Sequence, residues 1–336
     1  MRLTRRGKAL VAVCVGGFVL AALFGARALN AVVLPGVVAL AAGALQIRSL
    51  DPPTVDRDVP GDDFVGSTHE VTLRFRDVGR PFVGTVTDEV SEGLTSEQRE
   101  TTTTVGDGPV TYSVTYETRG EHRLGPARVV GRDVFGLFER ELRCSGDDSF
   151  LAYPTVYGVA GGVRRDLLAL HETDSADERA EFDNLREYVR GDALRDVHWK
   201  SSAKRDDLVV QEFTADRDLV DVTIAGGTTA AGADRLAEAV ASLAAALNDA
   251  DVPVALALPN GRVEADADRV GRTRLLEHCA RVVDGPVPTD EADVVVEARD
   301  SSVEIRLRDR RLTFDDVQGR ETLSATADGP PRGTTA

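Results

Sequence analysis

The sequence predicts a chain of three parts: a transmembrane helical hairpin, an all-β sandwich, and an α/β domain with a doubly wound sheet. Three observations support this prediction. Two uncharged apolar runs stand near the N-terminus, period-two alternation between Gly-containing breaks follows, and strand-like runs alternate with helix-like runs in the last part. We expect the three parts at residues 1–50, 51–160 and 161–325, with a disordered tail over 326–336.

The first part contains two runs of small and apolar residues, at about 9–26 and 29–47. As a helix, the first run is about 27 Å long, which is close to the hydrocarbon thickness of a bilayer. Arg27 separates the runs, so they predict two transmembrane helices joined by a tight turn. Four basic residues precede the first run: Arg2, Arg5, Arg6 and Lys8. The positive-inside bias therefore predicts a cell-membrane protein whose soluble domains are cytoplasmic.

An export signal is the competing interpretation of the same region. Arg5-Arg6 resembles a twin-arginine signal, and Ala26-Arg27-Ala28 resembles a cleavage site with small residues. However, Lys8 and Ala9 stand where such a signal has apolar residues. The second apolar run also has no place in a simple signal peptide, so we expect the hairpin.

The second part alternates apolar and polar residues in short stretches. Val71–Arg76 and Val110–Tyr116 have period two, Phe82–Val86 and Ala127–Val130 are rich in β-branched residues, and glycines separate them. Such strands with regular turn signals predict a small β-sandwich. The polar run Thr101–Thr104 is expected to be a loop or an edge strand. We interpret this part as a structural or interaction module.

The third part predicts alternating strands and helices. Leu236, Val240, Leu243 and Leu247 recur at helical spacing within Ala233–Leu247, and a second helix is expected over Arg272–Val283. Such alternation is typical of a doubly wound sheet. The expected strands are Leu208–Phe213, Leu219–Ala225, Val252–Leu258, Val294–Ala298 and Val303–Leu307.

Composition excludes some functions. The 336 residues carry a net charge of −16, so binding to nucleic acid is not expected, because the phosphate backbone repels an acidic surface. Of the 40 basic residues all but Lys8, Lys200 and Lys204 are arginine, and the acidic excess is typical of halophilic proteins.

The sequence contains three cysteines, Cys14, Cys144 and Cys279. They lack the spacing of a zinc site or of a disulfide framework, so we expect them to be buried thiols.

One segment, Phe182 to Phe213, differs from the rest of the chain. It contains the single tryptophan, Trp199, and, between Arg186 and Arg205, a local excess of basic residues that is opposed within that stretch only by Glu187, Asp192 and Asp196. One interpretation is an ion-pair network in which Trp199 is the apolar anchor. The other is an outward-facing surface that docks an acidic partner or phosphate. The sequence favours the network and leaves both open. The basic residues are Arg186, Arg190, Arg195, Lys200, Lys204 and Arg205.

This segment resembles the core motif of the domain-of-unknown-function 58 family, whose members are associated with MoxR-type AAA ATPases. The resemblance extends upstream to Arg119-Gly120, Leu124-Gly125-Pro126 and Arg132 to Phe138, and it includes the apolar hairpin. The matching motif positions are Phe182, Leu185, Arg186, Tyr188, Gly191, Asp192, Arg195, Trp199, Ser202, Ala203 and Lys204, with Val197 at an isoleucine position.

The resemblance implies an α/β domain similar to a von Willebrand factor A domain. Many such domains bind a divalent metal at Asp-x-Ser-x-Ser after the first strand. Here the equivalent stretch is Ala225–Thr229, which contains no carboxylate. Thr228 and Thr229 alone supply too few hard oxygen ligands for Mg²⁺, so we expect no metal and no cofactor at this position.

The motifs of common enzymes are also missing from the sequence. It contains no P-loop and no G-x-S-x-G nucleophile elbow. His198 stands near Asp192, Ser201 and Ser202, but closeness in sequence does not make a catalytic triad. We therefore expect a non-enzymatic adaptor or scaffold, and the resemblance implies a MoxR-type ATPase as its partner. A stand-alone envelope scaffold is the alternative, and a hydrolase using Asp192 and His198 is a third hypothesis.

Overall fold

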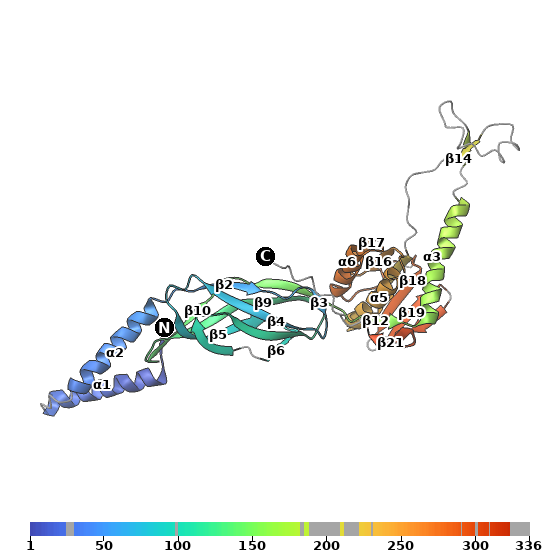
Figure 1. Ribbon diagram of the computed structural model, residues 1–336. Helices are drawn as coiled ribbons and strands as arrows, with labels where there is room; N and C mark the ends of the chain where they lie inside the picture. The colour runs from blue at the N-terminus through green and yellow to red at the C-terminus, as the bar shows by residue number, and fades with distance from the viewer. Residues whose placement is uncertain are drawn as a thin grey trace. The chain divides into compact units, whose positions relative to one another are not determined.

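The computed structural model describes residues 1–24, 30–97, 100–181, 185–187, 209–211, 222–229, 231–289, 291–299, 302–308 and 310–322. The chain divides into two compact units, Met1–Tyr153 and Pro154–Ala336, and each is described by itself (Figure 1). The turn predicted around Arg27 and the tail predicted over 326–336 lie outside the described residues.

The first unit begins with two long helices, as the apolar runs predicted: α1 (Arg5–Phe24) and α2 (Asn30–Arg48). Both are long and apolar enough to cross a membrane. The protein buries only 11% and 17% of their apolar windows, so neither helix resembles the core helix of a soluble domain. Their exposed apolar side chains require another covering.

Small residues let α1 and α2 pack closely against each other. A Cβ at Gly36 would lie 2.5 Å from the Cys14 sulfur, and a Cβ at Gly17 would lie 2.9 Å from a methyl group of Val33. A larger side chain at either glycine would push the helices apart. The same contact buries Cys14 between them.

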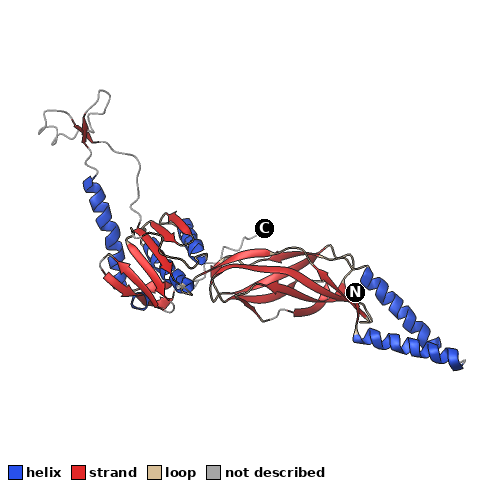
Figure 2. Ribbon diagram, turned by 180° about the vertical axis from the view of Figure 1, so that it is seen from behind, coloured by secondary structure: helices blue, strands red, loops and turns tan. Residues whose placement is uncertain are grey.

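Two β-sheets form the rest of the first unit (Figure 2). In the larger sheet, the long strand β9 pairs with β5, β10 and β11, and β7 pairs only with β5. The smaller sheet has the order β2-β4-β8-β6. The larger sheet contains β1 (Arg2–Leu3), β3 (Asp63–Phe64), β5 (Phe82–Val90), β7 (Glu100–Val105), β9 (Gly120–Arg132), β10 (Phe138–Arg143) and β11 (Asp148–Tyr153); the smaller contains β2 (Thr54–Asp58), β4 (Thr68–Arg76), β6 (Leu94–Ser96) and β8 (Val110–Tyr116).

Alternating side chains explain why the sheets stack. Val71 and Leu73 on β4 face the same core as Tyr112 and Val114 on β8, and all four are buried. One continuous core joins these residues to buried side chains of the larger sheet, such as Val129. The first unit is therefore a β-sandwich that extends from two apolar helices.

The second unit contains a six-stranded sheet in the order β17-β16-β15-β18-β19-β20. The central strands β16, β15 and β18 are parallel, and the outer strands are antiparallel to their neighbours. Its strands are β15 (Val222–Thr228), β16 (Val254–Leu258), β17 (Gly261–Ala265), β18 (Val294–Arg299), β19 (Ser302–Leu307) and β20 (Arg310–Thr313). Around it lie α3 (Gly161–Glu181), α5 (Ala233–Asn248), α6 (Arg269–Ala280), α7 (Phe314–Val317) and the ribbon of β12 (Tyr157–Val159) with β21 (Gln318–Thr322). A separate two-stranded ribbon pairs β13 (Leu185–Glu187) with β14 (Val209–Gln211).

Helix α5 covers one face of this sheet. A Cβ at Gly226 of β15 would lie 2.9 Å from the Leu236 side chain, and both α3 and α6 pack against α5. On the opposite face, the chain around Pro286 and Val287 passes close to Gly227. A doubly wound sheet has helices on both faces, so that part of the predicted fold stays a prediction.

Several predicted elements are confirmed, some of them with shifted ends. Val110–Tyr116 is β8 without change, and the polar run Thr101–Thr104 lies in the edge strand β7. The helix predicted over Arg272–Val283 instead spans Arg269–Ala280, because the Asp268 side chain accepts a hydrogen bond from the Gly271 N–H and caps its start. Helix α3 was not predicted, because its sequence is polar around most of its circumference.

Candidate functional site

The predicted functional segment, residues 182–213, is described at two short stretches of backbone. Strands β13 and β14 pair antiparallel, so Leu185 stands opposite Gln211 and Arg186 opposite Val210. This ribbon brings the two ends of the segment together. The choice between an ion-pair network and a docking surface stays open. The remaining motif residues lie outside the described residues: Phe182, Tyr188, Gly191, Asp192, Arg195, Trp199, Ser202, Ala203 and Lys204.

The groups proposed for hydrolysis also lie outside the described residues: Asp192, His198, Ser201 and Ser202. Within the described ranges, no group of three or more His, Cys, Asp or Glu side chains is placed to hold a metal ion. The expectations of no enzyme and no metal therefore stay predictions.

The carboxyl end of β15 is the position at which the sequence raised the question of a metal. Thr228 is 3% exposed, and no described group hydrogen-bonds to its hydroxyl. Its backbone exchanges two hydrogen bonds with Gly285, of 2.7 and 3.1 Å. A Cβ at Gly232 would clash with that hydroxyl, so the chain at Gly232 packs closely over the buried threonine.

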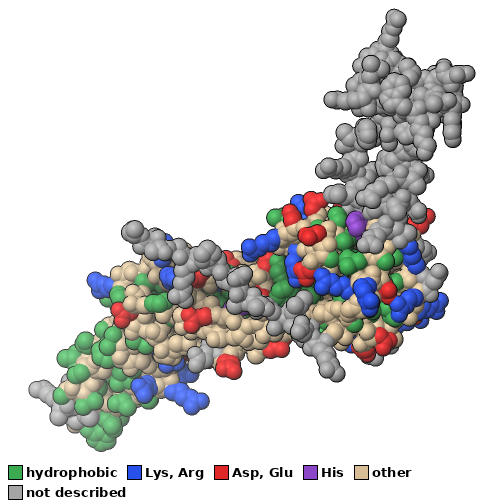
Figure 3. Space-filling view, turned by 45° about the vertical axis from the view of Figure 1, so that its right-hand side comes forward, with side chains coloured by type: hydrophobic (Ala, Val, Ile, Leu, Met, Phe, Trp, Pro, Cys, Tyr) green, Lys and Arg blue, Asp and Glu red, His purple; other side chains and the backbone are tan. Residues whose placement is uncertain are grey.

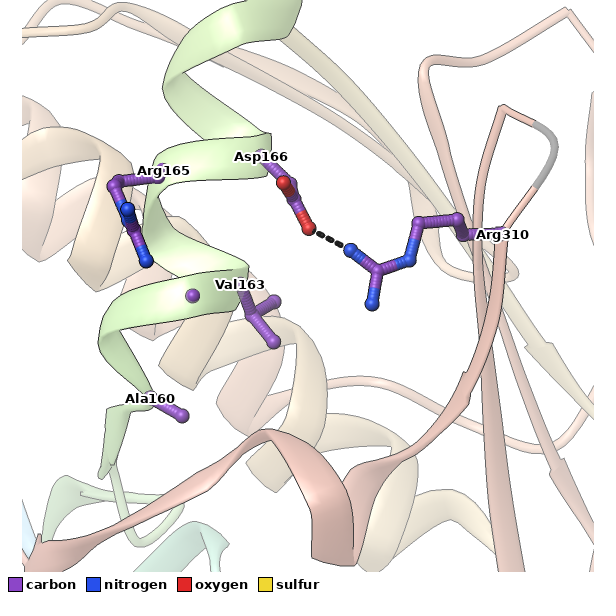
Figure 4. Close-up of a pocket in the computed structure, with 6 residues that line it drawn as sticks. Ala160, Val163, Arg165, Asp166 and Arg310 are labelled. Atoms are coloured by element: carbon purple, nitrogen blue, oxygen red, sulfur yellow. Dashed lines mark hydrogen bonds and ion pairs between the residues drawn. The ribbon is translucent and has the colours of Figure 1, made fainter.

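A surface hollow of about 380 Å³ lies where the start of α3 meets β20 (Figure 4). Asp166 of α3 and Arg310 of β20 point toward one another and form an ion pair there, while Val163 is buried beneath. The two side chains are 39% and 61% exposed, so the pair contributes little stability. The lining contains no Ser, Cys or His side chain, and its one carboxylate, Asp166, is paired with Arg310, so nothing in this hollow points to catalysis.

The sandwich contains a buried cluster of charged groups that joins its two sheets. Arg57 on β2 donates two hydrogen bonds to Asp88 on β5, of 3.0 and 2.8 Å, and a third of 2.6 Å to Asp148 on β11. The hydroxyl of Tyr112 on β8 donates to Asp88 over 2.6 Å. Arg57 and Asp88 side chains are 1% and 2% exposed, so water does not screen their interaction.

The pKa values of the groups in this cluster follow from its burial. Burial alone would lower the pKa of the Arg57 guanidinium, but hydrogen bonds and charges from Asp88 and Asp148 raise it above its usual value. Burial and the charge of Asp88 raise the pKa of Tyr112. The same two causes raise the pKa of the Cys144 thiol to about 11, which keeps it protonated and unreactive. The cluster therefore has a structural role, which is to hold the two sheets of the sandwich together. We call these four residues, Arg57, Asp88, Tyr112 and Asp148, the clamp of the sandwich.

A second set of contacts fastens the sandwich to the two apolar helices. Arg140 of β10 donates hydrogen bonds to the carbonyl groups of Leu50, Arg48 and Ile47, at 2.7, 3.3 and 3.4 Å. At the other helix, the Thr4 hydroxyl donates to Gly136 O over 2.7 Å. The chain before Thr4 pairs with β10 as strand β1. Both helices are thus connected to the same hairpin of the sandwich.

Sequence reasoning missed both sets of contacts. Arg57 lies 31 residues from Asp88 and 91 from Asp148, so no local pattern joins them. Arg140 stands in an ordinary alternating strand, and nothing in its neighbours distinguishes it. The upstream motif from Arg132 to Phe138 was the one sequence signal for these contacts, since it forms the β9–β10 turn that contacts the helices.

Solved structures resemble parts of the chain at low scores. A conjugative transposon lipoprotein from Bacteroides eggerthii DSM 20697 is 18% identical, covering 30% of this chain and 96% of that one, with a TM-score of 0.21. A cohesin module from the family 33 glycoside hydrolase of Clostridium perfringens ATCC13124 is 14% identical, covering 30% of this chain and 97% of that one, with a TM-score of 0.23.

Sequence comparisons match about a third of the chain. The uncharacterized protein YeaD of Bacillus subtilis (strain 168) is 29% identical over 112 residues, which are 32% of this chain and 28% of that protein. The match therefore spans well under two thirds of the relative. A family model described as protein of unknown function DUF58 matches residues 184–300, which include every position of the predicted motif except Phe182.

Proposed function

We propose that this protein is a membrane-anchored, non-enzymatic adaptor or scaffold that works with a MoxR-type AAA ATPase in the assembly or maturation of protein complexes. The observation that carries the proposal is the fastening of two apolar helices to the sandwich by Thr4 and Arg140. A rigid junction transmits force between the bilayer and a folded domain. A flexible tether would need no such contacts.

The start of the chain supports a cytoplasmic placement of the sandwich. Strand β1 pairs with β10, with Arg2 opposite Glu139 and Leu3 opposite Phe138. In this proposal the N-terminus and the sandwich therefore lie on the same side of the bilayer, which requires an even number of crossings. The four basic residues before the apolar run favour the cytoplasmic side.

The family resemblance supports the partner and the fold of the second unit. We propose that the second unit is von Willebrand factor A-like without the metal site, and that its acidic surface is adapted to high salt. The basic segment between Arg186 and Arg205 is the proposed docking surface for the ATPase. An ATPase partner would supply nucleotide hydrolysis, for which this chain has no P-loop.

Purification from native membranes in mild detergent and high salt tests the partner. Mass spectrometry of co-eluting proteins would compare wild type with Arg195→Ala and with the control Arg262→Ala, an exposed arginine on β17. We expect a MoxR-type ATPase with wild type and the control, and its depletion with the folded Arg195→Ala protein. Envelope proteins without any ATPase would favour the stand-alone scaffold. Esterase or peptidase activity lost in His198→Ala would favour the hydrolase.

Protease digestion of membrane vesicles tests the placement. In right-side-out vesicles the second unit should be protected, and in inverted vesicles it should be digested. Digestion in right-side-out vesicles would refute the cytoplasmic placement.

A further inference from the structure

A hollow of about 350 Å³ lies beside the junction of the helices and the sandwich. It is formed by the first turn of α1, the last turns of α2, the β9–β10 hairpin and the adjoining ends of β5 and β7. Arg6 and Arg132 line it together with the apolar side chains of Val83, Val134 and Phe135. Its lining therefore combines two cations with exposed apolar groups.

The tip of the β9–β10 hairpin exposes large apolar side chains. Val134 is 81% exposed and Phe135 is 54% exposed. The turn is held from inside, because the buried Asp133 carboxylate accepts hydrogen bonds from the N–H groups of Phe135 and Phe138, at 3.0 and 2.6 Å. Gly136 has a φ of +65°, which a side chain would strain. The fold thus holds two apolar side chains outward at a defined place.

That place lies level with the end of α2. The Val134 N–H donates to the Gln46 side chain over 3.2 Å, and the Asp133 carboxylate lies against Gly43, where a Cβ would be 2.9 Å away. Gly43 and Gln46 stand in the last two turns of a helix that ends at Arg48. At 1.5 Å per residue, these contacts with the hairpin lie about 3–8 Å before the end of α2 at Arg48. If α2 spans a bilayer as proposed, this position lies near the boundary between headgroups and acyl chains.

The cations of the hollow are available for a ligand. Arg6 and Arg132 are exposed, and no carboxylate of the described residues lies within ion-pair distance of either. The Asp133 carboxylate also lines the hollow, but its oxygens accept hydrogen bonds from backbone N–H groups. On the face shown in Figure 3, basic side chains lie next to the apolar helices, although the chain carries a net charge of −16.

We propose that this hollow binds the phosphate of an anionic phospholipid through Arg6 and Arg132, while Val134 and Phe135 enter the acyl region beside α2. The inference rests on the proposed membrane anchoring. A soluble phosphate would contact the arginines alone, and Val134 and Phe135 would stay exposed to water. A phospholipid accounts for both features, because its phosphate can bind the arginines while its acyl chains contact the apolar side chains.

Native mass spectrometry of the full-length protein in detergent tests lipid binding. The protein would be mixed with equal amounts of phosphatidylglycerol and phosphatidylcholine. We expect wild type to retain phosphatidylglycerol and the double variant Arg6→Gln/Arg132→Gln to bind it about tenfold more weakly or worse. The control Arg2→Gln/Arg5→Gln removes the same charge outside the hollow and should stay within about twofold of wild type.

Equal loss in both double variants, or loss in neither, would overturn the site. Displacement of the lipid by millimolar inorganic phosphate would show a soluble anion as the ligand and would also overturn the proposal. Alkaline carbonate extraction separates this test from the proposed function. If wild type is extracted, the anchoring fails; if it stays in the membrane while lipid retention is unchanged in Arg6→Gln/Arg132→Gln, only the lipid site fails.

A spin label tests insertion of the tip. Labelled Val134→Cys in vesicles should collide with oxygen more often than with a water-soluble nickel chelate, as expected for a side chain in the acyl region. Labelled Val283→Cys, an exposed position in the second unit, should show the opposite preference. A water-like response at position 134 would refute insertion.

Discussion

At the scale of single residues, the clamp of the sandwich predicts that Asp88→Ala destabilises the protein more than Tyr112→Phe does. Asp88→Ala leaves the buried Arg57 guanidinium and the Tyr112 hydroxyl without their main acceptor. We expect a loss of about 3–5 kcal/mol in the free energy of unfolding of the sandwich. Tyr112→Phe removes one hydrogen bond to a charged group and should cost about 1.5–3 kcal/mol.

Scanning calorimetry of the full chain would measure both effects on the transition of the first unit. The control is Asp147→Ala, an exposed neighbour of Asp148, which should change stability by less than about 0.5 kcal/mol. A larger loss in Tyr112→Phe than in Asp88→Ala would contradict the clamp.

Thr228 carries the prediction that the second unit binds no divalent metal. Its hydroxyl is enclosed by packing, and neighbouring Thr229 is exposed without a carboxylate beside it in sequence. We expect the melting temperature of wild type and of Thr228→Ala to be the same with Mg²⁺ and with a chelator. A rise in wild type with Mg²⁺ that Thr228→Ala abolishes would refute this.

At the scale of elements, His278 near the end of α6 predicts a pH effect. Burial and the charge of Arg281 lower the pKa of the imidazole, although its ring hydrogen-bonds to the Gly261 carbonyl over 3.1 Å. The unfolded chain therefore binds more protons than the folded one just below the ordinary histidine pKa of 6.5. This part of the stability is present above that pH and is lost as the pH falls.

The substitution His278→Gln should remove that dependence and keep a side chain able to donate to Gly261. We expect the melting temperature of the second unit to fall less steeply between about pH 7 and pH 5 in the variant. An unchanged slope would show that another group titrates there.

The elements that the sequence predicted best have strong periodicity. Strand β8 alternates at every position from Val110 to Tyr116, and α5 places Leu236, Val240 and Leu243 on one buried face. Helix α3 was not predicted, because its apolar residues form a narrow stripe near its start, where Val163, Leu167 and Leu170 are buried. Its remaining turns lack the apolar period from which helices are inferred.

The candidate sites were harder to predict than the elements, for a physical reason. Arg57, Asp88 and Asp148 meet because two sheets stack, and that stacking depends on the register of the whole sandwich. The motif between Phe182 and Phe213 had the clearest sequence signal, yet most of it lies outside the described residues. Its roles therefore stay predictions.

At the scale of the whole molecule, Arg140 should determine how firmly the sandwich is held to α2. Arg140→Ala removes hydrogen bonds to the carbonyl groups of Leu50, Arg48 and Ile47. The unpaired carbonyl groups at the end of the helix should loosen the chain around Asp51. We expect limited proteolysis of membranes to release the soluble part at least several-fold faster than in wild type.

The control for this experiment is Arg143→Ala on the same strand, whose exposed side chain lies near Glu141. It should leave the rate of release unchanged. Equal rates in Arg140→Ala and wild type would show that these hydrogen bonds do not limit opening.

The pairing of β1 with β10 also sets an order of events during synthesis. Thr4 bonds to Gly136, which lies 132 residues later in the chain, so the N-terminus cannot take its final place until the β9–β10 hairpin has left the ribosome. The apolar helices emerge much earlier and would enter the bilayer first. The last step of folding would then add β1 to the edge of the larger sheet, beside β10.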